Sequence, residues 1–368
     1  MLHQERERER FLATPIERFE PEAGLTVSQF LEKLEKTGGQ PRQLAEAAGL
    51  WDEILKEKRT VFCAIAGAPV PFGFGPTIAT LIEKKYIDVL AIPGSQIGHD
   101  VVETLGGKHF QGRVDSNDAK LIGNDINRYW NTFGDERDFK LSDEFYKGLM
   151  ASLSGKILTT REFLYRLGEA LVPCAKQDGI LTTAFKHSFP IYCPGIADSV
   201  VGTDIAEVRH KYGSIINFDV VADNLEATAI VAATEDLGGR TSAIIFGGGW
   251  PRNWIQQAQA CSYMIDRGKI AKGHAEAIRF SYDPAETGGL SGSTISEGIS
   301  WRKYSADVKS VEAFLDAQLS MALLAQFLLE KNPQRTWKLN FFHSEEDGTL
   351  SVCHNKKLVN LQEYIKHR

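Results

Sequence analysis

The sequence lacks the features of a secreted, membrane-bound or nucleic-acid-binding protein. Its 368 residues include five cysteines, none at the spacing of a metal-ligand or redox pair. No stretch approaches the roughly 20 apolar residues of a membrane span, and the N-terminus, MLHQERERER, alternates charge where a signal peptide needs an apolar run. No basic tract is dense enough to neutralise a row of phosphates. These absences predict a cytoplasmic protein with reduced thiols, no metal, no membrane contact and no nucleic-acid partner.

The composition is that of a globular protein with a modest acidic excess. Hydrophobic residues make up 43% of the chain, and 42 basic against 48 acidic side chains give a formal net charge of −6. A chain of this length can bury a sizeable core as one large domain or as two smaller ones. The acidic balance favours a cationic small molecule over a polyanion as ligand.

From Arg59 onward, short apolar runs are each followed by glycine or proline or lead into a helix. The predicted strands are residues 60–66, 87–92, 191–193, 215–220 and 243–246, and helices are expected near residues 77–85 and 97–105. This alternation is typical of βαβ units. The sequence therefore predicts an α/β fold, a Rossmann-like open and mostly parallel sheet with helices on both faces.

Three regions are expected along the chain. Residues 1–25 form an N-terminal helical arm, residues 26–331 the main ligand-binding domain, and residues 332–368 a C-terminal hairpin with a short helix. Within the main domain we expect helices at 27–35 and 41–56, a mainly helical segment at 140–185, and one long helical stretch at 308–331.

Ligands of an open parallel sheet bind where loops follow the carboxyl ends of the strands. Gly247, Gly248 and Gly249 follow the predicted strand AIIF and precede a helix, so their N–H groups are placed to receive a phosphate. The loops that contain Ala68 and Gly94 follow two other strands. No G-x-G-x-x-G pattern occurs, and tight turns explain these glycines as well.

Several polar residues near these loops are candidates for ligand contacts. His99 is expected to face the crevice, whereas Asp100 beside it suits a helix cap better. Asp198 follows the turn at Pro194, where a carboxylate holds ribose hydroxyls or a cationic amine. For Asp204, ligand binding and helix capping are equally supported.

The densest cluster of functional residue types is a Gly/Ser-rich loop at 288–294 followed by Glu297, Trp301 and Lys303. A lysine partly buried beside an aromatic ring loses hydration, so its pKa falls and the neutral amine can form an imine. A nearby glutamate can anchor a cationic substrate and relay protons. A solvated loop with a lysine stretched along the surface has the same composition. The three side chains converge only if the segment is helical or turned.

These residues resemble the deoxyhypusine synthase family. Glu297 to Lys303, EGISWRK, is similar to the family signature E-A-V-S-W-G-K. The glycine loop at 288–292, the triple glycine, Asp198 after Pro194, and Asp316 before Ala317 also match the family in order. The similarity extends over roughly residues 40 to 330.

The resemblance implies NAD-dependent transfer of an aminobutyl group from a polyamine such as spermidine, through an imine on Lys303, to an acceptor amine. Glu297 would bind an ammonium end and Trp301 would wall the methylene chain. Family members are homotetramers with sites shared at dimer interfaces. The expected site residues are Lys303 and Glu297 for catalysis; Trp301, Asn253, His99 and Asp204 for the substrate; and Asp198, Gly247, Gly248, Gly249, Ala68, Gly94, Ser291 and Asp316 for NAD.

The sequence departs from the family at two positions. Asn253 stands where a polyamine-contacting histidine is expected, and Leu290 stands where eukaryotic members have aspartate in G-S-D-S-G. Either Thr203 or Asp204 takes another amine-contacting aspartate position. The acceptor is therefore open between a protein lysine, that of translation initiation factor 5A, and a small diamine such as putrescine, which gives homospermidine. A non-catalytic protein that binds NAD or polyamine is the alternative from another class.

Overall fold

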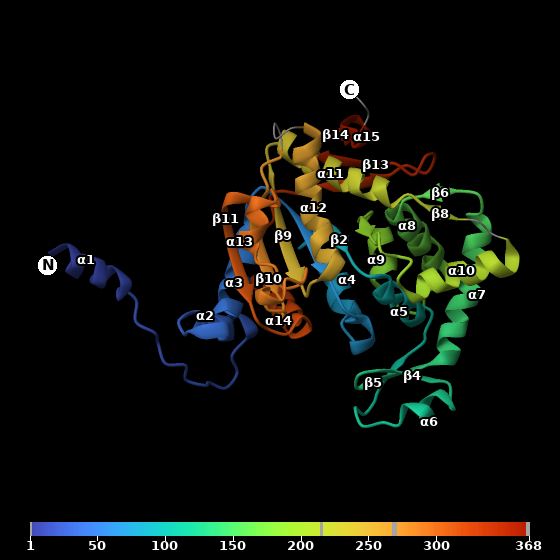
Figure 1. The fold of residues 1–368 in the computed structure, drawn as a ribbon, viewed down its shortest axis with the longest axis horizontal. Coiled ribbons are helices and arrows are strands. Elements are labelled where there is room, and N and C mark those ends of the chain that lie inside the picture. The colour runs from blue at the N-terminus through green and yellow to red at the C-terminus, as the bar shows by residue number, and fades with distance from the viewer. Residues whose placement is uncertain (1, 214–215, 267–270, 366–368) are drawn as a thin grey trace.

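The computed structural model describes residues 2–213, 216–266 and 271–365, and its centre is a six-stranded sheet (Figure 1). The strand order is β11-β10-β9-β1-β2-β7, and every pairing in it is parallel. This confirms the predicted α/β class with an open parallel sheet. The strands are β1 (Arg59–Ile65), β2 (Val89–Ala91), β7 (Ile191–Tyr192), β9 (Arg240–Phe246), β10 (His274–Phe280) and β11 (Tyr304–Ala313).

The chain order creates a switch point between β1 and β9. From β1 the chain proceeds outward through β2 to β7, then returns to β9 on the other side and continues through β10 to β11. Connections on the two sides of the switch point leave the sheet in opposite directions, which opens a crevice at the carboxyl ends of the strands. Gly67 follows β1 and Gly247 follows β9, so the glycine-bearing loops lie at this crevice.

Alternate residues of the strands feed two apolar layers, one on each face of the sheet. Val61, Cys63 and Ile65 of β1 belong to the first layer, whereas Phe62 and Ala64 belong to the second. The second layer is covered by α11 (Val220–Asp236) and α12 (Gly249–Asp266). The first is covered by α2 (Val27–Glu35), α3 (Gly39–Lys56), α4 (Gly75–Glu83), α5 (Gly94–Thr104), α7 (Glu136–Ser152), α8 (Thr160–Leu171), α9 (Ile180–Lys186), α10 (Val200–Tyr212) and α14 (Ala317–Lys331).

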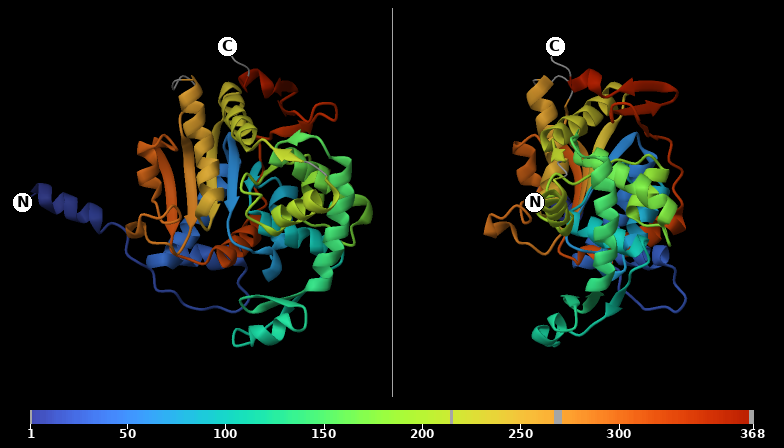
Figure 2. Two further views of the ribbon diagram at one scale, coloured as in Figure 1. Left: turned by 45° about the vertical axis from the view of Figure 1, so that its right-hand side comes forward. Right: turned by 90° about the vertical axis from the view of Figure 1, so that its right-hand side faces the viewer.

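A small antiparallel insertion extends from the carboxyl end of the main sheet, as Figures 1 and 2 show. It contains β3 (His109–Gln111), β4 (Ile126–Tyr129) and β5 (Thr132–Asp135) in the order β3-β5-β4, with α6 (Asp118–Ile122) between β3 and β4. The sequence did not predict it, because its strands are short and largely polar.

The C-terminal segment forms a separate antiparallel sheet. The predicted hairpin is confirmed as β12 (Asn340–His343) and β13 (Leu350–His354), and β14 (Lys357–Asn360) adds a third strand before the short helix α15 (Gln362–Ile365). Trp337, ahead of the hairpin, is fully buried and donates its indole N–H to Thr60 Oγ1 of β1 at 3.0 Å. This contact fixes the segment to the main sheet.

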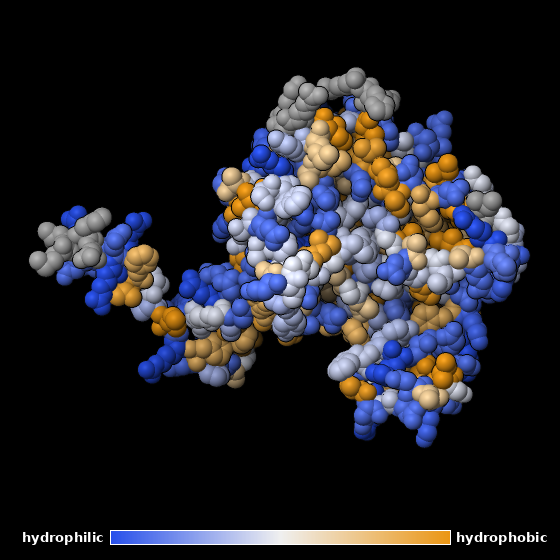
Figure 3. Space-filling view, viewed as in Figure 1, coloured by the Kyte–Doolittle hydropathy of each residue, from blue (hydrophilic) through white to orange (hydrophobic). Residues whose placement is uncertain are grey.

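The N-terminal arm begins with α1 (Leu2–Phe11), which stands away from the body of the chain. Figure 3 shows apolar colour where α1 ends, and Phe11, Leu12 and Ile16 are 87%, 66% and 68% exposed. Ion pairs of Glu17 with Lys36 and of Glu22 with Lys33 then hold the following segment against α2.

Two element predictions were wrong. Residues 308–331 are not one helix: residues up to Ala313 belong to β11, and α14 begins at Ala317. Residues 217–218 form β8 (Asn217–Phe218), which pairs with β6 (Ile157–Leu158) outside the main sheet, and residue 215 lies outside the described residues. Two of the six strands of the main sheet, β10 and β11, were therefore not predicted as strands.

Within the described ranges, no helix combines the length and apolar character needed to cross a bilayer.

Candidate active site

Lys303 lies in the turn between α13 (Ile295–Ser300) and β11, directly before β11. The short helix α13 begins where the hydroxyl of Thr294 accepts a hydrogen bond from Glu297 N, and it ends in a turn that places Arg302 at a positive φ of 61°. The ammonium of Lys303 donates to Asn253 Oδ1 at 2.8 Å. Asn253 is four residues beyond Gly249, about 6 Å along the helix axis. The amine of Lys303 therefore lies beside the first turns of α12.

The surroundings of Lys303 favour its neutral amine. Burial lowers the pKa of this side chain, and the positive charge of Arg252 lowers it further, whereas Glu297 acts in the opposite direction. An amine that loses its proton more readily is a better nucleophile near neutral pH. The lowered lysine pKa predicted from the sequence is thus supported, with Arg252 as a cause that the sequence did not reveal.

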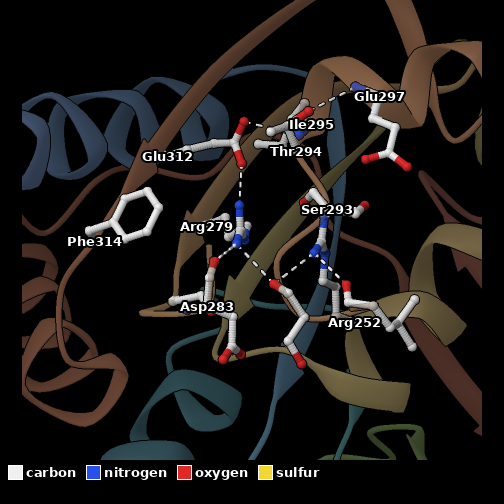
Figure 4. Close-up of polar contacts among 12 residues, drawn as sticks. Arg252, Arg279, Asp283, Ser293, Thr294, Ile295, Glu297, Glu312 and Phe314 are labelled. Atoms are coloured by element: carbon white, nitrogen blue, oxygen red, sulfur yellow. Dashed lines mark hydrogen bonds and ion pairs between the residues drawn. The ribbon is translucent and has the colours of Figure 1, made fainter. Parts of the chain in front are cut away.

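Arg252 is a buried cation that has no carboxylate partner among the residues that the structure describes. Its guanidinium is 1% exposed and donates to the backbone oxygens of Leu290, Ser291 and Ser293 (Figure 4). Burial lowers the pKa of this guanidinium too. Carbonyl oxygens stabilise the charge without neutralising it, so the field of Arg252 reaches Lys303.

A second arginine holds the same loop from the other side. Arg279 of β10 donates to Ser291 O at 2.8 Å and pairs with Glu312 of β11 at 2.6 Å (Figure 4). The other oxygen of Glu312 accepts from Ile295 N at the start of α13. Two arginines and one carboxylate thus fix the loop at 288–294 relative to the lysine.

Glu297 and Trp301, which precede Lys303 in the chain, are both open to solvent. Glu297 is exposed and lies close enough to Lys303 to affect its pKa, yet the two form no ion pair in the described chain. Trp301 is 66% exposed and does not enclose the site within a single chain. Leu290, in the adjoining loop, is 44% exposed.

The triple glycine at 247–249 packs against Ser291 of the loop at 288–294. A Cβ atom added to Gly248 would lie 2.3 Å from Ser291 Cβ, and the hydroxyl of Ser291 accepts a hydrogen bond from Gly249 N at 2.8 Å. The N–H of Gly249 is therefore occupied within the chain. Gly94 is crowded in the same way, since a Cβ there would lie 2.2 Å from Ser199 Oγ.

Three other residues predicted to bind the cofactor lie in loops at the carboxyl end of the sheet. Asp198 is exposed, and its carboxylate has no hydrogen-bond partner among the described residues. Asp316 caps α14 through Oδ1, which accepts from Leu319 N at 2.7 Å. Ala68 lies in the loop after β1 beside Gly67, where φ is +74° and a Cβ would meet nothing within 4 Å.

Three predicted contacts lie away from Lys303 within the chain. His99 is 5% exposed and its Nδ1 is 2.9 Å from His109 Nε2, so it faces the insertion instead. Asp204 is buried within α10, where burial and the charges of Asp143 and Glu207 raise its pKa to about 7. Thr203 is exposed and donates to the backbone of its own helix.

Asp100 does cap a helix, as predicted, but not its own. α5 begins at Gly94, and the Asp100 carboxylate accepts from Ile180 N at 2.6 Å and Leu181 N at 2.9 Å, at the start of α9.

The sequence missed Arg252 and Arg279 as site residues. One signal pointed to Arg252: a cation in the first turn of a helix opposes the helix dipole, so it needs a local reason to be there. Nothing in the pattern of β10 marks Arg279.

Comparisons with known proteins identify the family of this chain. The family model for deoxyhypusine synthase matches residues 29–327. Proteins described as "Probable deoxyhypusine synthase 2" are 35% identical: the one from Methanosarcina mazei over 83% of this chain and 87% of its own, and the one from Archaeoglobus fulgidus over 80% and 95%.

A solved structure shares the fold. It is described as that of a "putative deoxyhypusine synthase" from Entamoeba histolytica, and it aligns with a TM-score of 0.56 at 15% identity over 87% of this chain and 98% of that one. Together with the match over residues 29–327, these relatives establish that the chain belongs to the deoxyhypusine synthase family of transferases.

Proposed function

We propose that the protein transfers an aminobutyl group from a spermidine-like polyamine, through an imine on Lys303, to an acceptor amine. The observation that carries the proposal is the half-buried amine of Lys303, whose pKa is lowered by burial and by the unpaired guanidinium of Arg252. A solvated surface lysine has no such environment. The family membership supports the same chemistry.

Lys303 acts as the nucleophile in this scheme. Its neutral nitrogen attacks the carbon of the oxidised donor, the remaining diamine leaves with its nitrogen and takes up a proton, and an aminobutyl imine remains on the lysine. The acceptor amine then attacks the same carbon and releases Lys303. Asn253 Oδ1 orients the lysine amine by accepting its hydrogen bond, while Glu297 binds an ammonium end of the polyamine.

We propose NAD as the redox partner, held at the carboxyl ends of the strands. The free carboxylate of Asp198 and the second oxygen of Asp316 suit ribose hydroxyls, and the open backbone at Gly67 suits a close approach. Gly247 and Ala68 border the same crevice, whereas Gly248 packs against Ser291 and Gly94 packs against Ser199. When bound, NAD would accept a hydride from the donor carbon and return it to the product.

The assembly we propose is a homotetramer in which a second copy completes the site. Imine chemistry needs exclusion of water, yet Trp301 and Leu290 are both largely exposed in one chain. Their apolar surface beside the lysine is available to a neighbouring copy.

Borohydride trapping tests the proposal. The protein is incubated with NAD and either spermidine or putrescine and is then treated with borohydride. The mass of the peptide that contains Lys303 is measured by mass spectrometry. An aminobutyl adduct that depends on NAD and disappears in Lys303→Ala supports the mechanism. Absence of an adduct with both amines contradicts it and favours a non-catalytic binding protein.

The acceptor is identified in a second arm of the same experiment. Without borohydride, labelled spermidine is supplied with either translation initiation factor 5A or free putrescine. Label on the protein lysine supports the deoxyhypusine reaction, whereas labelled homospermidine supports transfer to a small diamine.

A further inference from the structure

A cavity of about 640 Å³ lies between the insertion and the loop that follows β1. Its walls come from β3, the β4–β5 turn, the end of α5 and the start of α14. The lining residues that bear on its chemistry are Phe72, Glu103, His109, Phe110, Trp130 and Gln318. None of Lys303, Asn253, Glu297 and Trp301 lines it, so it is separate from the surroundings of the Lys303 amine.

A chain of hydrogen bonds fixes the carboxylate in this cavity. Glu103 Oε1 accepts from His109 Nδ1 at 2.8 Å, and His109 Nε2 is 2.9 Å from His99 Nδ1. His99 packs edge-on against Tyr129, and burial together with His109 lowers the pKa of His99 to about 3. His99 is therefore neutral and adds no positive charge. Glu103 Oε2 has no hydrogen-bond partner among the described residues.

Trp130 is held at the cavity in a backbone conformation that tryptophan rarely adopts. It follows β4 in the two-residue turn to β5, with φ at +55°, and its side chain is 66% exposed. Glycine or asparagine is the ordinary residue for a positive φ, and a bulky side chain there is strained. A large aromatic ring kept at a strained, solvent-facing turn points to a binding role.

The charge of the cavity selects its ligand. Glu103 is the one carboxylate among the described lining residues, and no lysine or arginine lines the cavity with it. The rings of Phe72, Phe110 and Trp130 surround the same space. Aromatic faces and a carboxylate together attract an organic ammonium ion, through cation–π contacts and charge. Neither component favours an anion.

We propose that this cavity binds an organic ammonium ion, with the charge at Glu103 and the alkyl groups against Trp130 and its aromatic neighbours. The site is independent of the imine chemistry at Lys303. It would give the protein a second contact for amines, distinct from the one that carries the reaction.

The test measures binding of choline against its neutral carbon analogue, 3,3-dimethylbutan-1-ol, by calorimetry or ligand-observed NMR. Wild type should bind choline at least about tenfold more tightly than the analogue, because one desolvated cation–π or charge contact is worth that much. The same preference should persist in Lys303→Ala, which separates this cavity from the active site. Equal binding of both probes, or none of either, would overturn the proposal.

Two variants locate the site without unfolding it. Glu103→Gln keeps an acceptor for His109 while removing the charge, and Trp130→Gly removes the ring while relieving the positive φ. Each should weaken choline binding about tenfold or more, and Trp130→Gly should also leave the Tm equal or higher. Asp115 is an exposed carboxylate of the same insertion, and Asp115→Asn should change neither the choline affinity nor the Tm.

Adenosine serves as the competing probe, because a carboxylate also binds ribose hydroxyls. One outcome would assign the cavity to a nucleoside and contradict the proposal. In it, wild type binds adenosine but not choline, and Glu103→Gln no longer binds adenosine. An unchanged choline affinity in both variants would contradict it as well.

Discussion

Arg252 and Asn253 are consecutive residues of α12 that act on Lys303 in different ways. Arg252 brings a buried positive charge that no carboxylate of the described chain pairs with, whereas Asn253 accepts the hydrogen bond of the lysine amine. An amide oxygen cannot take up a proton at neutral pH. Asn253 therefore positions the lysine and leaves the proton transfer to Glu297, whose charge acts on Lys303.

The charge of Arg252 predicts the pH dependence of imine formation. The neutral fraction of Lys303 rises as pH passes its pKa, so a lowered pKa moves the rise in trapping rate to lower pH. Arg252→Met should move this rise to higher pH and reduce trapping several-fold at pH 7. Arg252→Lys keeps the charge and should stay closer to wild type. The check is the rate of borohydride trapping from pH 6 to 10; coinciding profiles for the two variants would show that charge is not the cause.

Asp204 predicts a pH dependence of stability. Its pKa is raised from 3.8 to about 7 in the folded protein by burial, with Asp143 and Glu207 adding to the effect. The unfolded chain loses the proton first, so stability falls as pH rises from about 4 to 7 and then levels off. Asp204→Asn should remove this loss. The Tm of the variant minus that of wild type should therefore be about 2–4 °C larger at pH 8 than at pH 4.

Thermal unfolding of wild type and Asp204→Asn at pH 4, 6 and 8 checks this. A Tm difference that stays constant with pH would mean that the carboxyl is ionised in the folded protein. Asp198→Asn, at an exposed carboxylate, is the matched control and should show no such trend.

At this scale the sequence predicted the residues that carry the motif but not those that support it. The EGISWRK segment identified Lys303 and Glu297 because their types and order are themselves the signal. The contacts of Arg252 join residues 38 to 41 positions apart, and only the fold brings them together. The contact of His99 with His109 was not predicted for the same reason, because His109 belongs to an insertion that the pattern did not show.

Among the elements, the loop at 288–294 is defined by what it packs against. Ser291 fills the space that a side chain at Gly248 would need. Gly248→Ala should therefore displace the loop and destabilise the protein by about 1–3 kcal/mol, as overpacking does. Ser291→Gly in the same chain should restore much of this loss.

Urea unfolding of the two single variants and the double variant measures the coupling. Additive effects would show that Gly248 is needed for a different contact. Gly238→Ala tests a positive-φ glycine with nothing within 4 Å of its Cβ, and Ser291→Gly should not rescue it.

The start of α9 depends on a carboxylate from α5. Asp100 accepts from Ile180 N and Leu181 N, both buried. Asp100→Ala leaves these donors unsatisfied and should cost about 1–3 kcal/mol in the free energy of unfolding. Asp100→Asn keeps one acceptor and should cost less. Equal losses in urea unfolding would mean that the hydrogen bonds are not the main contribution.

The sequence predicted elements well where the apolar pattern was strong. β1 and β9 contain apolar runs followed by glycine. The predicted ends of β1 differ from the observed ones by one residue, and those of β9 by at most three. β11 was assigned to a helix because its exposed edge carries polar residues such as Lys309 and Glu312 between valines, and its strand state depends on pairing with β10.

Over the whole molecule, the fold brings loops from both sides of the β1–β9 switch point to one edge. Asp198 and Asp316 come from opposite ends of the sheet, after β7 and β11. The alternation of strands and helices predicted this arrangement from the sequence. The surface that a second copy would cover, around Trp301, followed only from the exposure of that side chain in the structure.

The central claim is that Lys303 forms the imine, and the most direct measurement is the mass of its peptide after borohydride treatment with NAD and spermidine. The account predicts one aminobutyl group on Lys303, formed faster as pH rises toward its lowered pKa and absent in Lys303→Ala. An unmodified Lys303 peptide with spermidine and with putrescine, in protein that binds NAD, would contradict it.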